Sequence, residues 1–274
     1  MELLAVDIGN TSATLGLFES GGKLASRFDI PTRTLTHRAL TRESLEGPLS
    51  GIGAPNAIAI ASVVPWASDE LIFVLREIFP PADVIVIAGS NIPVRIDYPR
   101  PEELGTDRLL GALAAYKLFG EAAQRPCIVV DLGTATTYDC ITSEGIFLGG
   151  AIAPGLELGA EALAQRAALL PSIELSFPSS IIGRTTVESI QSGILFGGLS
   201  QIEGFVERLR QFAFPNESPI VVATGGLSRL IEGRTSVVTH FHPDLVLEGV
   251  RIAAELTAGE LVEEPVIYNE EIGV

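Results

Sequence analysis

The stretch Leu3-Leu4-Ala5-Val6-Asp7-Ile8-Gly9-Asn10-Thr11-Ser12-Ala13-Thr14-Leu15-Gly16-Leu17-Phe18 decides the fold of this chain. An apolar run ends on an acid, turns through small residues and becomes apolar again, which predicts a strand, a tight turn and a returning strand. Asp7 stands at the end of the first strand, beside a turn whose Gly9, Asn10 and Thr11 expose backbone N–H groups. These donors and the carboxylate suit a phosphate with bound Mg²⁺, an ion that keeps much of its hydration. Taken alone, the same residues also fit an ordinary hairpin turn.

A second copy of this design lies about half a chain further on, in Val129-Val130-Asp131-Leu132-Gly133-Thr134-Ala135-Thr136-Thr137-Tyr138-Asp139-Cys140-Ile141. Two such hairpins predict a duplicated domain whose turns face each other across a cleft. A third turn, Thr224-Gly225-Gly226, follows another apolar run, and its missing side chains would let a flat ring lie close to the backbone. Together the three turns predict a nucleotide between two lobes, with phosphates on the hairpins and adenine near the double glycine.

The composition indicates a globular protein with sizeable cores, since 47% of the 274 residues are hydrophobic. There are 34 acidic and 18 basic residues, and the net charge of −16 argues against nucleic acid as a partner. No apolar run reaches the roughly 18 residues of a membrane span, so we expect a cytoplasmic protein without membrane contact. Cys127 and Cys140 are expected to be reduced and buried, and to lie opposite each other if the second hairpin pairs symmetrically.

The predicted elements repeat in the same order in the two halves of the chain. This order is similar to the fold shared by actin, sugar kinases and the Hsp70 ATPase, so we expect an α/β, actin-like (ribonuclease H-like) duplicated fold. Each lobe would have a mixed five-stranded sheet with flanking helices. The lobes would span residues 1–118 and 119–274, the final helix could pack back on the first lobe, and the acidic tail at 262–274 is expected to be loose. Besides the hairpins, the predicted strands are at 23–29, 57–63, 83–88, 145–148, 220–224 and 236–239, and the predicted helices at 36–45, 68–79, 106–120, 156–168, 186–212 and 244–261.

Acidic residues are predicted in the first turn of two helices of the first half. Asp69 and Glu70 would open the helix at 68–79, and Thr106 would cap a helix that places Asp107 in its first turn, where the helix dipole favours the ionised form. Arg108 beside it can hold an anion. The alternative for this segment is a capping acid with a surface ion pair. The segment 149–155, rich in glycine and alanine, is predicted to be a loop at the edge of the second sheet.

In combination these motifs resemble type III pantothenate kinase over nearly the whole chain. The resemblance implies ATP-dependent phosphorylation of the primary hydroxyl of pantothenate, the first step of coenzyme A biosynthesis. It also implies a homodimer that uses Mg²⁺, or another divalent ion, together with K⁺ or NH₄⁺. The matching pieces are Asp7-Ile8-Gly9-Asn10-Thr11, Tyr98 with Gly105-Thr106-Asp107-Arg108, Asp131-Leu132-Gly133-Thr134-Ala135-Thr136-Thr137, Gly149-Gly150-Ala151-Ile152-Ala153-Pro154-Gly155, Ile182-Gly183-Arg184-Thr185-Thr186 and Thr224-Gly225-Gly226.

Roles for individual residues follow from the resemblance by position. Asp107 would accept the hydroxyl proton, Asp131 would bind the monovalent cation, and Asp7 would hold Mg²⁺ through water. The family usually has Asn where this chain has Thr185, and the other subunit would donate Thr186. The residues implied to bind ATP are Asp7, Gly9, Asn10, Thr11, Ser12, Ala13, Thr14, Thr134 and Gly225, and those implied to surround pantothenate are Tyr98, Gly105, Thr106, Asp107, Arg108 and Thr186.

Two other functions fit parts of the sequence. A kinase or phosphatase of the same fold that acts on a sugar or an acyl phosphate would share the phosphate hairpins, but Tyr98 and the Gly-Thr-Asp-Arg segment argue against it. A non-catalytic regulator of the Bvg accessory factor type would not require the acidic residues. The presence of Asp7, Asp107 and Asp131 therefore favours an enzyme.

Overall fold

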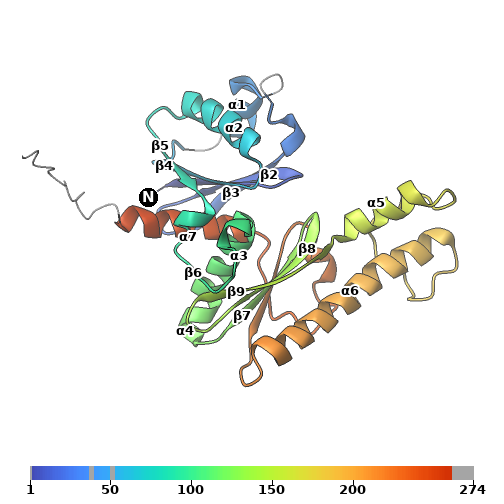
Figure 1. Cartoon of the computed structure of the whole chain (residues 1–274). Helices are drawn as coiled ribbons and strands as arrows, with labels where there is room; N and C mark the ends of the chain where they lie inside the picture. The colour runs from blue at the N-terminus through green and yellow to red at the C-terminus, as the bar shows by residue number, and fades with distance from the viewer. Residues whose placement is uncertain (1, 37–39, 50–52, 261–274) are drawn as a thin grey trace, which may run out of the picture.

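Two β-sheets face each other across a central layer of two helices, α3 (Thr106–Ala115) and α7 (Leu245–Glu260) (Figure 1). The structure is a computed structural model that describes residues 2–36, 40–49 and 53–260. The acidic tail predicted to be loose lies outside these residues. Within them, no helix combines the length and the apolar character that crossing a membrane requires.

The first sheet has the strand order β3-β2-β1-β4-β5. β1 pairs antiparallel with β2 and parallel with β4, so an antiparallel meander continues into a parallel half. Helices α1 (Arg42–Leu49) and α2 (Pro65–Ile78) cover the face opposite α7. The strands are β1 (Leu3–Ile8), β2 (Ser12–Phe18), β3 (Leu24–Pro31), β4 (Ala57–Ser62) and β5 (Asp83–Ile87).

The second sheet repeats this plan in the order β11-β10-β7-β8-β9-β6. Its outer face packs on α5 (Leu156–Arg166) and on the long helix α6 (Thr186–Ala213). The sixth strand, β6, was not predicted and comes from the first half of the chain to pair with β9. The strands are β6 (Arg95–Ile96), β7 (Cys127–Leu132), β8 (Ala135–Ile141), β9 (Ile146–Pro154), β10 (Ile220–Thr224) and β11 (His240–Phe241).

Two strands of the second sheet differ from the prediction. Most of segment 149–155, expected to be a loop, belongs to β9. A Cβ at Gly150 would collide with the carbonyl group of Tyr138, so this glycine serves close strand packing. The strand predicted at 236–239 lies at His240–Phe241, because these two residues pair with β10.

The first two helices also begin at other residues than predicted. In the helix expected at 36–45, residues 37–39 lie outside the described part, and α1 begins after Thr41. Thr41 and Ser44 form a reciprocal cap, each side chain accepting the other's backbone N–H at 3.2 and 3.0 Å. α2 begins at Pro65, whose fixed φ suits the first helical position. Asp69 and Glu70 therefore lie beyond the first turn, and the prediction that they open the helix is wrong.

Helix α3 confirms the predicted start but not the predicted cap. Its N-cap is Gly105, no side chain caps it, and Thr106 is already helical. Asp107 lies in the first turn as expected. The helix continues through a π-helical stretch, Tyr116–Gly120, into α4 (Glu121–Ala123).

The two cysteines are buried and form no disulfide, as expected. They do not lie opposite each other. Cys127 pairs in register with Ile141, and Cys140 pairs with Ile128. One thiol joins the core around α3 and α7, and the other joins the core under α6. Because successive residues of a strand face opposite sides of a sheet, a one-residue offset puts the thiols on different faces.

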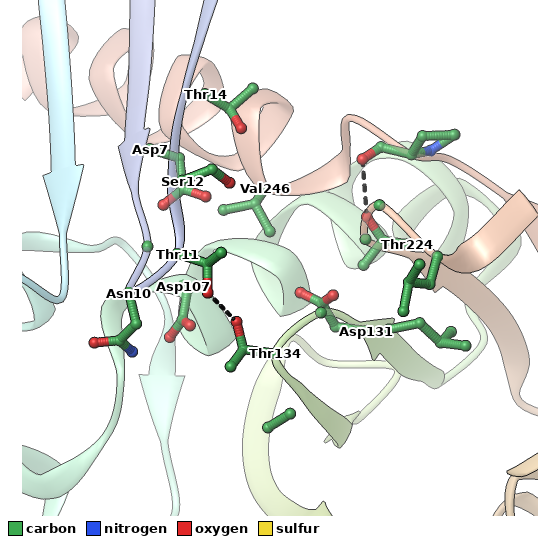
Figure 2. Close-up of a pocket in the computed structure, with 18 of the residues that line it drawn as sticks. Asp7, Asn10, Thr11, Ser12, Thr14, Asp107, Asp131, Thr134, Thr224 and Val246 are labelled. Carbon is green, nitrogen blue, oxygen red and sulfur yellow. Dashed lines mark hydrogen bonds between the residues drawn. The ribbon is translucent and has the colours of Figure 1, made fainter. Parts of the chain in front are cut away.

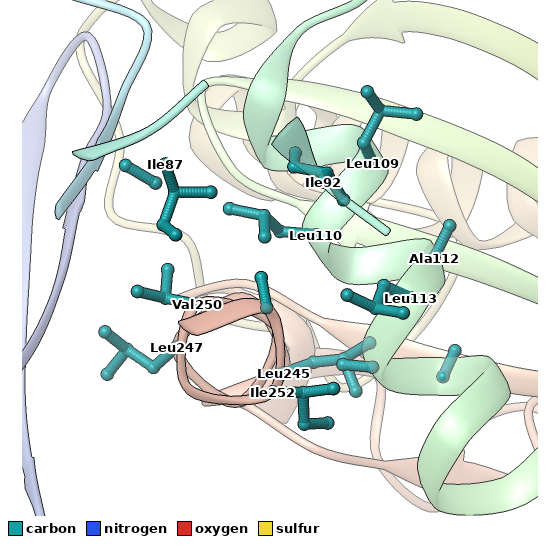
Figure 3. Packing of buried hydrophobic residues seen from close by; sticks show 14 of the residues in the cluster. Ile87, Ile92, Leu109, Leu110, Ala112, Leu113, Leu245, Leu247, Val250 and Ile252 are labelled. Carbon is teal, nitrogen blue, oxygen red and sulfur yellow. The ribbon is translucent and has the colours of Figure 1, made fainter. Parts of the chain in front are cut away.

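The central layer holds the sheets in place through the contact between α3 and α7 (Figure 3). Leu110 and Leu113 of α3 and Val250 of α7 are buried there, and a side chain of this size contributes about 1.5–3 kcal/mol when it leaves water. A Cβ at Gly249 would collide with the carbonyl group of Leu110, so the two helices approach more closely than side chains would allow. This packing fixes the start of α3, and with it Asp107, between the two sheets.

Candidate functional site

The two acidic hairpins occupy equivalent places in the two sheets and meet at their turns. In the first, Asp7 pairs in register with Thr14, and in the second Asp131 pairs with Thr137. The hydroxyl groups of Thr11 and Thr134 form a hydrogen bond of 2.8 Å between the turns (Figure 2). Segments far apart in the sequence therefore present one continuous set of carboxylates, hydroxyls and turn backbone.

A cavity of about 640 Å³ lies between the hairpins and the start of α3. This volume is in the range of sites for small molecules and cofactors. Figure 2 shows Asp7, Asp107 and Asp131 around it, on elements of both sheets and of the central layer. The cavity walls include Asp7, Gly9, Asn10, Thr11, Ser12, Thr14, Asp107, Asp131, Thr134 and Gly225 from the residues that the sequence nominated.

Gly225 joins this cavity through a packing requirement. Its φ is +87°, and a Cβ there would collide with the Asp131 carboxylate and with the backbone of Leu132. Gly226 has open space around its Cα. Gly225 is thus required by the close approach of β10 to β7, while Gly226 leaves room at the cavity wall.

Two carboxylates of the cavity, Asp7 and Asp131, hold protons more tightly than an ordinary aspartate. Burial, together with the charges of Asp107 and Asp131, raises the pKa of Asp7 to about 8, and burial is the largest cause. Loss of solvent also raises the pKa of Asp131 to about 7, together with the charges of Asp107 and Asp139. Such a concentration of negative charge favours cations in the cavity.

Neither Asp7 nor Asp131 forms an ion pair with a described cationic side chain. No three His, Cys, Asp or Glu side chains of the described residues are arranged to hold a metal ion. An ion that binds through one carboxylate, water and phosphate oxygens fits this arrangement, which is how Mg²⁺ often binds in nucleotide sites. The donors present therefore suit a cation that enters with a phosphorylated ligand.

Asp107 and Arg108 have different surroundings. One carboxylate oxygen of Asp107 accepts the backbone N–H of Arg108 at 2.9 Å, and the side chain faces the cavity. Arg108 instead pairs with Asp139, with 2.6 Å between Nη2 and Oδ1. The side chains of this pair are only 12% and 2% exposed, so the alternative of a surface ion pair is wrong.

Several nominated residues do not line the cavity. The ring of Tyr98 lies against Gly149, Ala13 is buried in the core beneath α2, and Thr186 begins α6 at an exposed position. Gly105, Thr106 and Arg108 adjoin Asp107 at the start of α3, but they do not line the cavity themselves. Part of the nominated set thus lies outside the cavity wall of a single chain.

The cavity also includes residues that sequence reasoning missed. Arg27 is the one Lys, Arg or His in the cavity wall within the described part of the chain, and it reaches Asp29 and Asp244, each at 3.1 Å. Thr14 donates a hydrogen bond to Asp29 at 2.7 Å. The alternation of β3 could have indicated Arg27 and Asp29, since they share the face of Thr14. No local pattern indicates Asp244, which precedes α7.

Thr185 keeps the capping function that Asn also supplies. Its hydroxyl accepts the backbone N–H of Glu188 at 3.2 Å, and Glu188 accepts the N–H of Arg184 at 2.7 Å. Asn and Thr are both favoured N-cap residues. The start of α6 is therefore well formed with Thr at this position.

Comparisons with known proteins agree with this geometry. Residues 3–208 match the sequence model of the type III pantothenate kinase family. A relative of that name from Bacillus cytotoxicus is 39% identical and covers 93% of this chain and 97% of its own length. A second, from Streptomyces coelicolor, is 38% identical and covers 92% and 97%.

Two solved structures show the fold at low sequence identity. One, named as a member of the Baf family of transcriptional activators from Campylobacter jejuni, has a TM-score of 0.58 at 17% identity and covers 94% of this chain and all of its own. The other, component A of (R)-2-hydroxyglutaryl-CoA dehydratase from Acidaminococcus fermentans, has a TM-score of 0.53 at 15% identity and covers 94% and 99%. The predicted actin-like α/β fold is confirmed.

Proposed function

Since the chain belongs to the type III pantothenate kinase family, we propose that it transfers the γ-phosphoryl group of ATP to the primary hydroxyl of pantothenate. The product would enter coenzyme A biosynthesis, and a kinase that uses ATP is expected in the cytoplasm. One observation carries the proposal beyond family membership. The two phosphate hairpins and the carboxylate of Asp107 line the same cavity, so a phosphoryl donor and an alcohol could meet there.

The hairpins are the proposed site of the ATP phosphates. Turn backbone and the hydroxyl groups of Thr11 and Thr134 can donate hydrogen bonds to phosphate oxygens. In this chain the two hydroxyls bond each other at 2.8 Å, so phosphates would take over these donors. Gly225 and Gly226 would border the adenosine.

Asp107 is the proposed acceptor of the hydroxyl proton. A carboxylate is a weak base toward an alcohol, because its ordinary pKa is about 3.9. Phosphoryl transfer passes through a loose transition state, so the proton can leave late and orientation of the hydroxyl contributes more than basicity. The position of Asp107 in the first turn of α3, beside the α3–α7 contact, supports this role, since a fixed carboxylate would orient the hydroxyl.

Cations would balance the charge of the donor and of the cavity. We assign a divalent ion to the ATP phosphates, where Asp7 would hold it through water. We assign K⁺ or NH₄⁺ to Asp131. When bound, such ions neutralise charge on the phosphate oxygens during transfer. Both carboxylates line the cavity and neither pairs with a described cationic side chain, which supports both assignments.

A homodimer is the proposed assembly, with Thr186 of one subunit near the pantothenate of the other. In a single chain Thr186 is exposed and does not line the cavity. Exposed apolar side chains occur on β9, α5, α6 and the segment between these helices, and a second copy could bury them. They are Ile152, Leu158, Leu163, Leu169, Ile181, Ile182 and Val187, which are 66%, 46%, 38%, 92%, 65%, 75% and 41% exposed.

A coupled assay of ADP formation tests the reaction. We expect turnover with pantothenate, Mg²⁺ and K⁺, and none with hexoses or acetate as acceptor. Light scattering after gel filtration tests the dimer, which the change Ile182→Asp should weaken by placing a charge in the apolar contact. ATP binding without phosphorylation of pantothenate under these conditions would contradict the proposed function.

A further inference from the structure

Asp139 is a buried carboxylate next to the proposed site that none of the roles above includes. It lies on β8 with only 1% of its surface exposed. Its Oδ1 accepts hydrogen bonds from Nε and Nη2 of Arg108, at 2.8 and 2.6 Å, and its Oδ2 accepts one from Thr137 at 3.0 Å. Burial raises the pKa of Asp139 to about 6, while Arg108 and Thr137 oppose that rise.

Stability alone is a weak reason for such a pair. Removal of two charges from water offsets most of the attraction between them, and apolar residues of similar size often stabilise a protein as well or better. Arg108 also lies in the first turn of α3, where the helix dipole disfavours a positive charge. The pair therefore indicates that the position of the Arg108 guanidinium group matters for function.

The duplicated hairpins show that this carboxylate is specific to the second lobe. Asp131 pairs with Thr137 and Val129 with Asp139, just as Asp7 pairs with Thr14 and Ala5 with Gly16 in the first lobe. The position equivalent to Asp139 is therefore Gly16, which faces α7. Only in the second lobe does this position meet a cationic side chain of α3.

The pair also decides which groups Arg108 leaves free. Its Nε and Nη2 are both bound to Asp139, while Nη1 has no hydrogen-bond partner among the described residues. The charges of Asp107 and Asp131 both interact with that of Asp139, so these two carboxylates are the negative charges that remain in this region when Asp139 is removed. Arg108 would then turn toward the carboxylates of the cavity.

We propose that Asp139 is a positioning residue for the acceptor substrate: it holds the guanidinium of Arg108 away from Asp107, with Nη1 directed to the carboxylate of pantothenate. This inference rests on the proposed function. It predicts that the charge of Asp139 matters for binding of the anionic acceptor, and that it matters little for ATP.

The test is steady-state kinetics of Asp139→Asn, an exchange of nearly equal volume. We expect the KM for pantothenate to rise about tenfold or more while the KM for ATP stays within about twofold. Pantothenol, in which a hydroxyl replaces the carboxylate, supplies a second readout as a competing ligand. Its inhibition constant should change less than the KM for pantothenate, because it has no carboxylate for Arg108 to bind.

Glu248→Gln is the matched control. Glu248 accepts Nε and Nη2 of Arg251 on one oxygen, both at 2.9 Å, and these side chains are 12% and 13% exposed. This pair lies against Phe18 and Gly22, away from the cavity. Loss of stability with unchanged KM values is expected for this variant, as for any pair with a structural role alone.

The outcomes separate the two proposals. An unchanged or lower KM for pantothenate in folded Asp139→Asn, or an equal rise in both KM values, would overturn the inference while pantothenate kinase activity stands. If Asp139→Asn has no thermal unfolding transition, Asp139→Glu takes its place, and the same rise is expected because the guanidinium moves with the carboxylate. Wild-type protein that never phosphorylates pantothenate would overturn the proposed function itself.

Discussion

Replacing Asp131 by Asn should stabilise the ligand-free protein, and more so as the pH rises. The pKa of Asp131 is about 7 in the folded chain and 3.8 for an ordinary aspartate, so the folded chain holds this proton more tightly than the unfolded chain. Between these two values, ionisation costs folding free energy as the pH rises. Below the lower value the group is neutral in both states, and the cost disappears.

The expected size follows from the same shift. At about 1.36 kcal/mol per pKa unit, keeping Asp131 ionised near pH 8 costs about 4 kcal/mol. An amide in its place carries no charge, but it costs about 1–3 kcal/mol if it finds no hydrogen-bond partner. We expect a net gain of about 2 kcal/mol near pH 8, or roughly 5 °C in Tm for a chain of this size, and no gain near pH 4.

Thermal unfolding of wild type and Asp131→Asn, followed by circular dichroism between about pH 4 and pH 8, measures this difference. The buffer should contain tetramethylammonium chloride as its salt, so that no small cation occupies the site. Addition of KCl should then stabilise the wild type more than the variant, because K⁺ removes the same charge that the substitution removes.

A constant stability difference across this pH range would refute the electrostatic argument. So would a variant that is less stable than the wild type near pH 8. Equal stabilisation of both proteins by KCl would contradict the assignment of the monovalent cation to Asp131, and would leave the pH argument intact.

Three further predictions concern single side chains. Asp107→Asn should lower kcat at least about a hundredfold with ATP binding and Tm nearly unchanged, and near-normal turnover would falsify its role as proton acceptor. Gly225→Ala should lower Tm, because the new Cβ meets Asp131 and Leu132 at a φ of +87° and costs about 2 kcal/mol or more; an unchanged Tm would show that β10 can move away. Thr185→Ala should cost about 1 kcal/mol by removing the N-cap of α6, and Thr185→Asn should cost almost nothing, so equal Tm losses in the two variants would contradict the capping function.

Part of the site was predictable because its signals are local. An apolar run that ends on Asp7 or Asp131 and continues into a turn of small residues specifies a hairpin from a few neighbouring residues. The duplication of the pattern then implied that the turns face each other, and the hydrogen bond between Thr11 and Thr134 agrees with that expectation. Asp107 was indicated by its place in the first turn of a helix.

Other members of the site had no signal in their own neighbourhood. Asp244 precedes a helix that packs against the first sheet, far away in sequence from its ion-pair partner Arg27. Gly225 looked like a space for a flat ring, whereas the approach of β10 to β7 is what excludes its side chain. The offset of Cys127 and Cys140 depended on a strand register that symmetry about the turn did not predict.

The sequence by itself determined the alternation of strands and helices, the two acidic hairpins and the family, because each depends on periodicity or on motifs of adjacent residues. The tertiary structure decided how charges are shared between Asp107, Arg108 and Asp139, and how strongly Asp131 holds its proton. Ion pairing and desolvation depend on distances between elements and on the exclusion of water. Those quantities exist only after α3 and the second sheet have packed together.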